Sequence, residues 1–520
     1  MAVESTTGVN LSDAMILADV PLGDWLVIAP VALPILAGAV LLMFRHYTRT
    51  QGMIAIAALA LLLAVDIGLL VRVLDQGPVV MTMGRWLPPF GIAFAADALG
   101  ATLAAASALV ALVAAVFSLF DIDATGRRYG FYPFLLLMMA GVSGSFLTGD
   151  IFNLYVWFEV FLISSFGLII LGSEPKQIDG ATKYAVLNLV ATTLFLIATG
   201  LLYGAFGTLN MADIARKAAG LRETAPLMTL GVMYLLAFGM KAAAFPVNFW
   251  LPASYHTPRI VTGALFGGLL TKVGIYALLR TEVMLFAPER AALAELISWI
   301  AAATMIIGVL GALSQSDIRR VLGFIVVSGI GVMLAGIAIS TPLGISGTIV
   351  YAVHSMIVMT ALYILAGVMR ALGGSYSLHE LGGLYRQAPL LAAFALLLFF
   401  SVAGLPPGSG LWPKVMLVRA SLDDSAWWLG LAILASGLLT TIAMGRVFIL
   451  AFWRPSSADA QDREPAAAPL VGYVSLGVLT AAAFAIGIYP EPLVGMADMA
   501  AAGLLDASGY IDAVFPAGVR

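Results

Sequence analysis

The chain alternates between long apolar stretches and short polar connections. Fourteen stretches approach the roughly 20 apolar residues that a helix needs to cross a bilayer. They occupy residues 25–44, 53–74, 95–120, 130–148, 151–172, 181–205, 226–249, 260–281, 293–313, 320–340, 343–369, 388–420, 426–452 and 469–488. We therefore predict an all-α polytopic membrane protein with about fourteen transmembrane helices, because lipid offers no partner to an unpaired backbone group. Thirteen or fifteen spans are the alternatives, since Asp66 lies inside the second stretch and the twelfth is interrupted.

The connections are too short for a folded domain outside the membrane, and their charge is uneven. Arginines occur in alternate connections, at Arg45 and Arg49, Arg127 and Arg128, Arg319 and Arg320, and Arg370. The positive-inside rule places these connections in the cytoplasm, and fourteen spans then place both termini outside. No Lys or Arg precedes Arg45, which is unlike a secretory signal. Segment 207–223 lies on the opposite side and is either an amphipathic surface helix or a solvated loop.

Composition agrees with this pattern, since 61% of the residues are apolar and 11% are charged. Soluble domains have about 45–50% and about 25%. The net charge of −3 offers no basic surface for nucleic acid. The absence of cysteine excludes disulfides and Cys-ligated zinc or iron–sulfur clusters. We expect no metal and no cofactor, and therefore a function carried out by protons, ions and a few side chains within the bilayer.

The lysines are distributed differently from the arginines. The chain has 20 arginines, nearly all at span ends or in connections, but only 6 lysines. Lys241, Lys272 and Lys414 fall within spans and Lys183 falls in the first turn of one. Arginine does not release its proton in proteins, whereas a desolvated lysine can. The pattern favours proton handling over the alternative of structural ion pairs or lysines that reach back to the interface.

One carboxylate lies at a matching depth. Glu159 follows Asp150 by nine residues, which is ~13 Å along a helix, so it lies near the middle of a hydrocarbon core ~30 Å thick. A charged group there usually marks an ion pathway or a buried partner. Asp150 lies at the boundary, where an acid at a helix N-terminus is the simpler interpretation.

Two spans contain helix-breaking residues next to a lysine. In GMKAAAFPVNFWLP (239–252), Lys241 precedes Pro246, which should kink the helix. In GLPPGSGLWPK (404–414), Pro406 and Pro407 precede Lys414. Paired interrupted segments in two halves are typical of transporters built from repeats.

A lysine and a histidine lie between these breaks in the sequence. Lys272 is flanked by glycines, and His354 is the one histidine deep within a span. An imidazole ordinarily titrates near pH 6.5, which suits a proton relay between lysines. The alternative is a histidine that simply bonds a backbone carbonyl.

These strings together resemble a known family, the antiporter-like subunits shared by Mrp-type cation/proton antiporters and respiratory complex I. They are most like the D subunits of Mrp complexes. The resemblance is carried by TGDIFNLYVWFEVFLISSFGLI (148–169), GTLNMADIA (207–215), KAAAFPVNFWLP (241–252), HTPRIVTGALFGGLLTKVGIYAL (256–278), SQSDIRRVLGFIVVSGIG (314–331) and GLPPGSGLWPK (404–414).

The resemblance implies fourteen helices in two inverted five-helix repeats, with helices seven and twelve broken. It places the N-terminal helices within 1–129, the first repeat within 130–282, the second within 293–452, and a last helix and tail within 453–520. The family's proton-relay residues fall on Glu159, Lys241, Lys272, His354 and Lys414. Many relatives carry a lysine shortly after the histidine, whereas Ser355 to Thr360 contain none, which leaves His354 as the bridge in the second half.

The resemblance also implies a function. The chain would translocate protons in exchange for Na⁺ or K⁺ within a complex of different membrane subunits, as a multi-pass protein of the bacterial inner membrane. It would not be an enzyme itself and would bind no quinone, nucleotide or nucleic acid. One alternative is a homologous proton-pumping subunit of an NADH:quinone oxidoreductase or a membrane-bound hydrogenase. Another is a structural subunit that conducts nothing.

Overall fold

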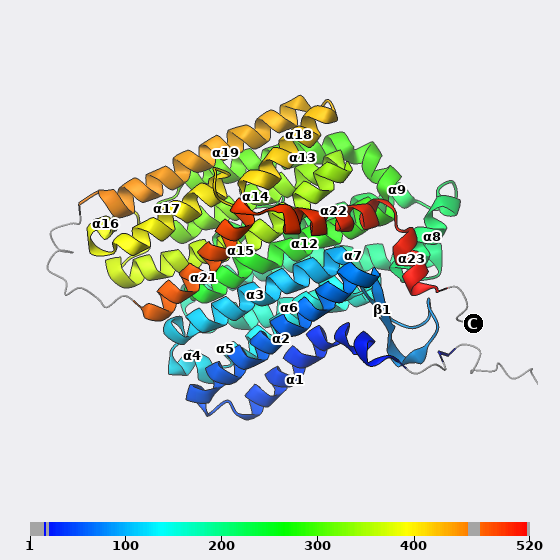
Figure 1. Ribbon diagram of the computed structural model, residues 1–520, viewed down its shortest axis with the longest axis horizontal. Helices are drawn as coiled ribbons and strands as arrows, with labels where there is room; N and C mark the ends of the chain where they lie inside the picture. Colours follow the sequence, from blue (N-terminus) through cyan, green and yellow to red (C-terminus); the bar gives the residue numbers. More distant parts are fainter. Residues whose placement is uncertain (1–14, 17–19, 456–468, 517–520) are drawn as a thin grey trace, which may run out of the picture.

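The computed structural model describes residues 15–16, 20–455 and 469–516, which form a bundle of long helices lying side by side (Figure 1). In this part of the chain, ten helical segments are long and apolar enough to cross a membrane. They are α2 (Thr48–Gln76), α3 (Ala98–Asp121), α6 (Ile151–Ile169), α7 (Pro175–Phe206), α11 to η5 (Ile260–Leu285), α13 (Ala287–Ser314), α14 (Ile318–Ile339), α15 (Pro342–Gly373), α19 with η6 (Trp427–Trp453) and α21 (Leu470–Ile488). Four shorter apolar helices accompany them: α1 (Ala29–Met43), α5 (Phe131–Leu147), α9 (Leu227–Ala242) and α17 (Pro389–Ala403). The all-α polytopic fold is confirmed, while the count of fourteen spans stays a prediction.

Several helices begin where a polar side chain immediately precedes an apolar run. Asp97 accepts a hydrogen bond from Gly100 N at the start of α3, and Asp150 accepts one from Asn153 N at the start of α6. Each carboxylate satisfies a backbone N–H that has no partner within the helix. Glu159 therefore lies nine residues into a helix that begins where the sequence predicts.

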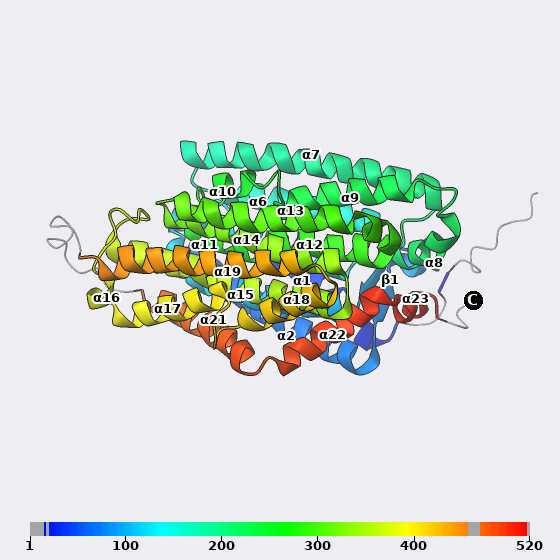
Figure 2. The same cartoon turned by 90° about the horizontal axis from the view of Figure 1, so that it is seen from above.

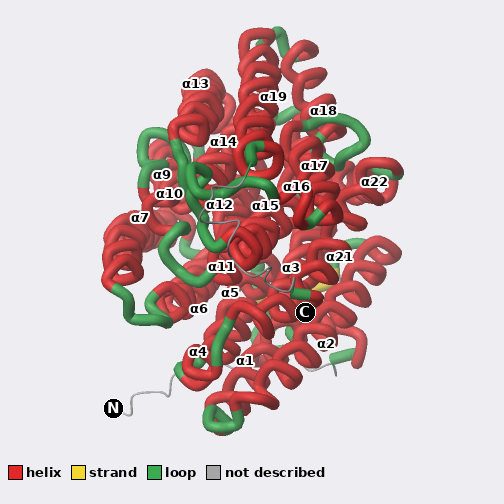
Figure 3. Tube along the Cα trace, turned by 90° about the vertical axis from the view of Figure 1, so that its left-hand side faces the viewer, coloured by secondary structure: helices red, strands yellow, loops and turns green. Residues whose placement is uncertain are grey.

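The centre of the bundle contains the segments that lipid does not reach. The most apolar windows of Ile260–Leu285 and of α15 are 100% buried within the chain, against 28% for α2 and 39% for α7. Figure 3 looks along the helices and shows α12 and α15 in the middle, with α1, α7 and α19 at the periphery. Figure 2 shows α7 along one flank. The central segments carry Lys272 and His354, so both are shielded on all sides.

Both predicted breaks are present. Helix α9 ends at Ala242, and after a non-helical stretch the chain resumes as α10 (Trp250–Ser254). Helix α17 ends at Ala403 and the chain resumes as α18 (Leu411–Asp423). Pro246 lies in the first break and Pro406 and Pro407 in the second. The first is a full interruption where the sequence suggested a kink, because Ala243 adopts a left-handed conformation with φ +63° that already ends the helix.

The central segment Ile260–Leu285 changes its hydrogen-bonding pattern along its length. It runs through α11 (Ile260–Leu265), the π-helical turn η4 (Phe266–Leu270), α12 (Thr271–Leu278) and the π-helical turn η5 (Leu279–Leu285). Such turns widen a helix locally and occur often at functional sites. They lie on either side of the segment that carries Lys272.

Some elements were not expected from the sequence. Strands β1 (Val79–Thr82) and β2 (Ala93–Ala96) pair antiparallel before α3, where a span was predicted to begin at residue 95. Beyond α21, helices α22 (Glu491–Leu505) and α23 (Ser508–Val514) occupy what was expected to be a tail. The remaining short elements are η2 (Leu22–Leu26), η3 (Met83–Arg85), α4 (Ala124–Arg128), α8 (Met211–Leu221) and α16 (Leu384–Gln387).

The arginine-bearing connections meet at one end of the bundle. The guanidinium groups of Arg319 and Arg370 lie 4.0 and 5.2 Å from the centroid of the Tyr376 ring. Arg259 forms an ion pair of 3.6 Å with Asp123. Helices α4 and α16 lie at this end, whereas α8, α23 and the β-hairpin lie at the other (Figure 1). Helix α8, at the other end, also carries Arg216 and Lys217, so the positive-inside orientation of the bundle stays a prediction.

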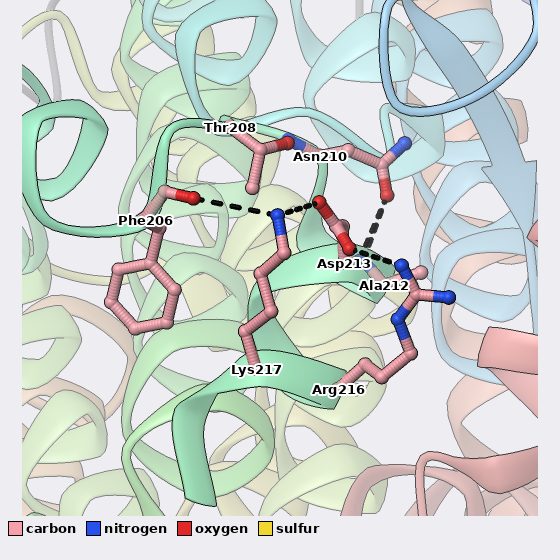
Figure 4. Close-up of polar contacts among 7 residues, drawn as sticks. All are labelled: Phe206, Thr208, Asn210, Ala212, Asp213, Arg216 and Lys217. Atoms are coloured by element: carbon pink, nitrogen blue, oxygen red, sulfur yellow. Dashed lines mark hydrogen bonds and ion pairs between the residues drawn. The ribbon is translucent and has the colours of Figure 1, made fainter. Parts of the chain in front are cut away.

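Segment 207–223, which had two interpretations, contains a helix. The Asn210 side chain caps α8, and the fully buried Asp213 accepts hydrogen bonds of 2.7 Å from both Arg216 and Lys217 (Figure 4). Lys217 also approaches the carbonyl of Phe206 at 3.4 Å. The amphipathic-helix interpretation is therefore correct. The buried carboxylate of Asp213 stabilises the helix from within, and Lys217 links it to the end of α7.

Candidate functional site

The three lysines predicted to lie within spans are all buried. Lys241, Lys272 and Lys414 are 5%, 1% and 9% exposed. Lys183 instead lies on the surface of α7, in an ion pair of 2.6 Å with Asp179. The structure thus separates three buried amines from the exposed lysines, and Lys183 lies outside the buried group.

Lys241 lies in the last turn of α9 in an aromatic environment. Its Nζ is 5.1 Å from the centroid of the Phe158 ring, and within the described residues it has no hydrogen-bond partner. Glu159, the neighbour of Phe158 in α6, acts on the amine electrostatically. The buried Oε1 of Glu159 also has no partner in the described part of the chain. The acid and the amine thus influence each other without forming a closed ion pair.

Lys272 donates a hydrogen bond of 2.5 Å to the carbonyl of Gly267, within the π-helical turn η4. Its helix touches the end of α9: a Cβ added to Gly274 would lie 3.0 Å from the backbone N of Ala242. Ala242 follows Lys241 directly and Gly274 lies two residues beyond Lys272, so the two lysines come from helices in backbone contact.

Lys414 caps the C-terminus of α17, the helix that precedes the second break. Its Nζ donates to the carbonyls of Ala403 at 2.7 Å and Val402 at 3.3 Å, which belong to the last turn of α17. The C-terminus of a helix is favourable for a cation. Gly404 has φ +87°, and a Cβ there would lie 2.5 Å from Lys414 Cδ, so glycine is needed for both the backbone and the contact.

His354 lies between the central segment and the second break. Its Nδ1 is 2.7 Å from the hydroxyl of Ser409, which is in the break. Both Lys272 and Lys414 act on the imidazole electrostatically. On the other side, a Cβ added to Gly268 would lie 3.2 Å from the carbonyl of Met356, so η4 and α15 are in contact close to His354.

The predicted residues form a continuous series across the bundle. It runs from Glu159 on α6 to Lys241 on α9, Lys272 on α12, His354 on α15 and Lys414 on α18. The segments that carry consecutive members of the series are in contact with each other, although the five side chains do not bond to one another directly. Beyond Lys414, a groove of about 600 Å³ opens between α18 and α19 and is lined mainly by apolar side chains. The series therefore ends beside a recess in the surface.

The remaining predicted acids have different environments. Asp150 caps α6, as its simpler interpretation required. Asp66 is fully buried in α2, and neither of its carboxyl oxygens has a hydrogen-bond partner among the described residues. No contact in this part of the chain explains Asp66.

The sequence analysis missed a buried ion pair near the end of the central segment Ile260–Leu285. Arg280 donates to Asp97 at 2.5 Å and to the hydroxyl of Tyr276 at 3.1 Å. Asp97 also caps α3, and its arginine partner lies 183 residues away in the sequence. Glu282, nearby in η5, is also fully buried. The available signal was the charged pair at Arg280 and Glu282 directly after an apolar run.

The fold is that of antiporter-like membrane subunits. Residues 148–440 match the family described as "NADH:quinone oxidoreductase/Mrp antiporter, TM", and the chain belongs to this family. Within it, curated relatives are named as the D subunits of Na(+)/H(+) antiporters. The protein from Alkalihalophilus pseudofirmus is 39% identical over 94% of this chain and 99% of the relative, and that from Bacillus subtilis is 36% identical over the same shares.

Solved structures agree with this assignment. A chain of the Mrp complex from Dietzia sp. DQ12-45-1b superposes with a TM-score of 0.89 and 29% identity, covering 95% of this chain and 100% of that one. A chain of respiratory complex I from Thermus thermophilus gives a TM-score of 0.80 at 23% identity, over 92% of this chain and 99% of that one. The second match shows a shared fold alone.

Proposed function

We propose that this chain is the proton-translocating subunit of a multisubunit monovalent cation/proton antiporter in the cytoplasmic membrane of a bacterium. Other membrane subunits complete the complex, which exchanges Na⁺ or K⁺ for protons at the expense of the proton-motive force. The observation that carries the proposal is the buried series from Glu159 to Lys414, five ionisable side chains linked by helix contacts. The names of its relatives support the exchange of Na⁺ for H⁺.

The first step of translocation takes place between Glu159 and Lys241. A carboxylate ~6 Å from an ammonium stabilises it by about 2.8 kcal/mol at an effective dielectric constant of about 20. That energy is about 2 units of proton affinity. Burial opposes the charged form, and the amine has no other polar partner in the described residues. Approach of Glu159 therefore loads a proton on Lys241, and withdrawal of Glu159 releases it toward Lys272.

The later steps pass between amines that have fixed acceptors. Lys272 rests on the Gly267 carbonyl, and Lys414 rests on the carbonyls that end α17. A carbonyl accepts a hydrogen bond from an ammonium and from a neutral amine alike. Each lysine is thus held in one place in both protonation states, and His354 lies between them. Pro246, Pro406 and Pro407 keep the two breaks open beside the amines.

The proposal is tested in the complete complex, produced in a bacterial host that lacks its own sodium/proton antiporters. Everted membrane vesicles are energised, and a pH-sensitive dye reports the proton flux on addition of Na⁺ or K⁺. We expect Lys241→Ala and Glu159→Gln to abolish the cation-dependent flux. Lys176→Ala, at an exposed position, is the control and should transport normally.

The outcome that contradicts the proposal is equally specific. If Lys241→Ala retains cation-coupled proton flux in an assembled complex, the buried series does not conduct the protons. If Glu159→Ala and Lys414→Ala also leave transport intact, the chain is a structural subunit.

A redox complex is the second candidate, because the family description also names NADH:quinone oxidoreductase. The same residues would serve there, since the proton path is shared. The chains that co-purify with this one separate the two candidates. Small membrane subunits without prosthetic groups support the antiporter, and flavin or iron–sulfur proteins support the redox complex.

A further inference from the structure

The path between His354 and Lys414 contains two hydroxyl groups to which no role has yet been given. Ser409, in the second break, lies 2.7 Å from His354 Nδ1, and its Oγ is 3.1 Å from that of Ser401 in the last turn of α17. Both serines are fully buried. Ser401 directly precedes Val402 and Ala403, whose carbonyls hold Lys414. The hydroxyl pair therefore begins at the imidazole and ends in the helix turn whose carbonyls accept hydrogen bonds from Lys414.

These two serines bond differently from three other buried serines that lie in helices. Ser107, Ser145 and Ser436 each donate to a carbonyl three or four residues earlier in the same helix. Such a bond fixes the direction of the hydroxyl proton. In the described part of the chain, Ser401 and Ser409 bond to each other and to His354, and in the serine pair either oxygen can be the donor. Their protons are thus free to reverse direction, which a proton wire requires.

The backbone around the pair is built for close approach. A Cβ added to Gly410 would lie 2.9 Å from His354 Cε1 and 3.0 Å from Nε2. A Cβ added to Gly408 would lie 2.5 Å from Ser401 Cα. Any side chain at these two positions would push the break away from His354 and from α17. The glycines therefore hold the two hydroxyls within hydrogen-bond reach.

We propose that Ser409 and Ser401 form a hydroxyl relay that carries protons from His354 toward Lys414. This inference rests on the proposed function. It also accounts for the lack of a lysine between Ser355 and Thr360, because the hydroxyls replace the missing amine.

The transfer balances without any further reactant. A proton from the Lys272 side binds Nε2 of His354, and the imidazole releases the proton on Nδ1 to Ser409 Oγ. Ser409 passes its original hydroxyl proton to Ser401 Oγ, and Ser401 passes its own to the neutral amine of Lys414. At His354 one N–H bond forms at Nε2 and one breaks at Nδ1, each hydroxyl breaks one O–H bond and forms one, and one N–H bond forms at Lys414. The two hydroxyls then rotate back, and the next transfer follows once the proton left on Nε2 has moved to Nδ1.

The test compares Ser409→Ala, Ser409→Thr and Ser401→Ala in vesicles that carry the complete complex. Loss of a proton-transfer group typically lowers a rate about 10²-fold, so we expect both alanine variants to lose most of the coupled flux. Ser409→Thr keeps the hydroxyl and should retain flux within about a factor of three of the unaltered complex. Ser421→Ala is the matched control: this serine of α18 is equally buried but donates to the Val418 carbonyl.

The order of the variants distinguishes a relay from packing. A tightly packed position tolerates alanine better than the larger threonine, whereas a relay requires the reverse order. If the threonine variant fails to assemble, Ser409→Cys takes its place in the test. A thiol is a weaker donor than a hydroxyl, so this variant should give a flux between those of Ser409→Ala and the unaltered complex. Normal flux in Ser409→Ala together with lost flux in Lys241→Ala overturns the relay and leaves the proposed function standing. Normal flux in both overturns the proposed function as well.

Discussion

Replacing a buried lysine by methionine should destabilise the subunit clearly at Lys414 and hardly at all at Lys241. Methionine has a similar length but no charge and no donor. At Lys414 the change removes the hydrogen bonds to Ala403 and Val402. A buried carbonyl left without a partner costs ~1–3 kcal/mol. The longer of the two bonds is weak, so we expect Lys414→Met to destabilise the folded subunit by about 2–4 kcal/mol.

At Lys241 the same substitution removes no hydrogen bond, because none is present in the described structure. The contact with the Phe158 ring is lost, which costs ~0.5–2 kcal/mol. Relief of the amine's burial offsets this loss. We therefore expect Lys241→Met to change the stability by less than about 1 kcal/mol, although both variants lose transport.

The assay is the fraction of purified complex that remains assembled after heating in mild detergent, measured by size-exclusion chromatography. A difference of about 3 kcal/mol between the variants corresponds to roughly a hundredfold difference in the unfolding equilibrium. Lys414→Met should dissociate at a clearly lower temperature than Lys241→Met. If Lys241→Met is as unstable as Lys414→Met, Lys241 has a structural partner and the reasoning is wrong.

Three further changes test other parts of the molecule. Arg280→Met leaves the buried Asp97 carboxylate without its cation and should lower the free energy of unfolding by about 3–5 kcal/mol. Adding Asp97→Asn should recover most of this loss, since asparagine still caps a helix. A double-mutant cycle of thermal stability measures the coupling between the two residues. Gly268→Ala places a Cβ 2.2 Å from the Thr360 hydroxyl and should cost about 1–3 kcal/mol, whereas Gly68→Ala, with open space around it, should be neutral in the same thermal assay. Asp213→Ala leaves the two cations of α8 unpaired, and trypsin should then cleave this helix faster than in the unaltered chain.

The buried ionisable residues could be found from the sequence because each stands out against an apolar stretch. An amine inside a span is rare enough to be noticed, and the placing of Lys241, Lys272 and Lys414 within the bundle is confirmed by their burial. Their acceptors could not be found in this way. The Gly267 carbonyl receives Lys272 because η4 is a π-helical turn, and no residue type marks such a turn.

Contacts between segments distant in the sequence could not be predicted, because they depend on how the helices pack. Asp97 and Arg280 are visible in the sequence as charged residues, but their pairing depends on how α3 packs against the segment Ile260–Leu285. The helices of the last 30 residues were missed because α22, at 15 residues, is shorter than a span. The first break was placed correctly from Pro246, yet the helix ends earlier because Ala243 turns the chain.

Lys241 is held less firmly than the other two buried amines, because Lys272 and Lys414 both donate to backbone carbonyls. Lys414 keeps its carbonyl acceptors whether or not it carries a proton, so its position is nearly independent of its charge. Lys241 responds to Glu159 and has no competing hydrogen bond in the described residues. A movement of α6 relative to α9 therefore changes the distance between the Glu159 carboxylate and the Lys241 amine. A comparable movement near Lys414 has less effect, because the carbonyls at the end of α17 keep this amine in place. We infer that the Glu159–Lys241 pair controls when a proton enters the path, and that the second half conducts it.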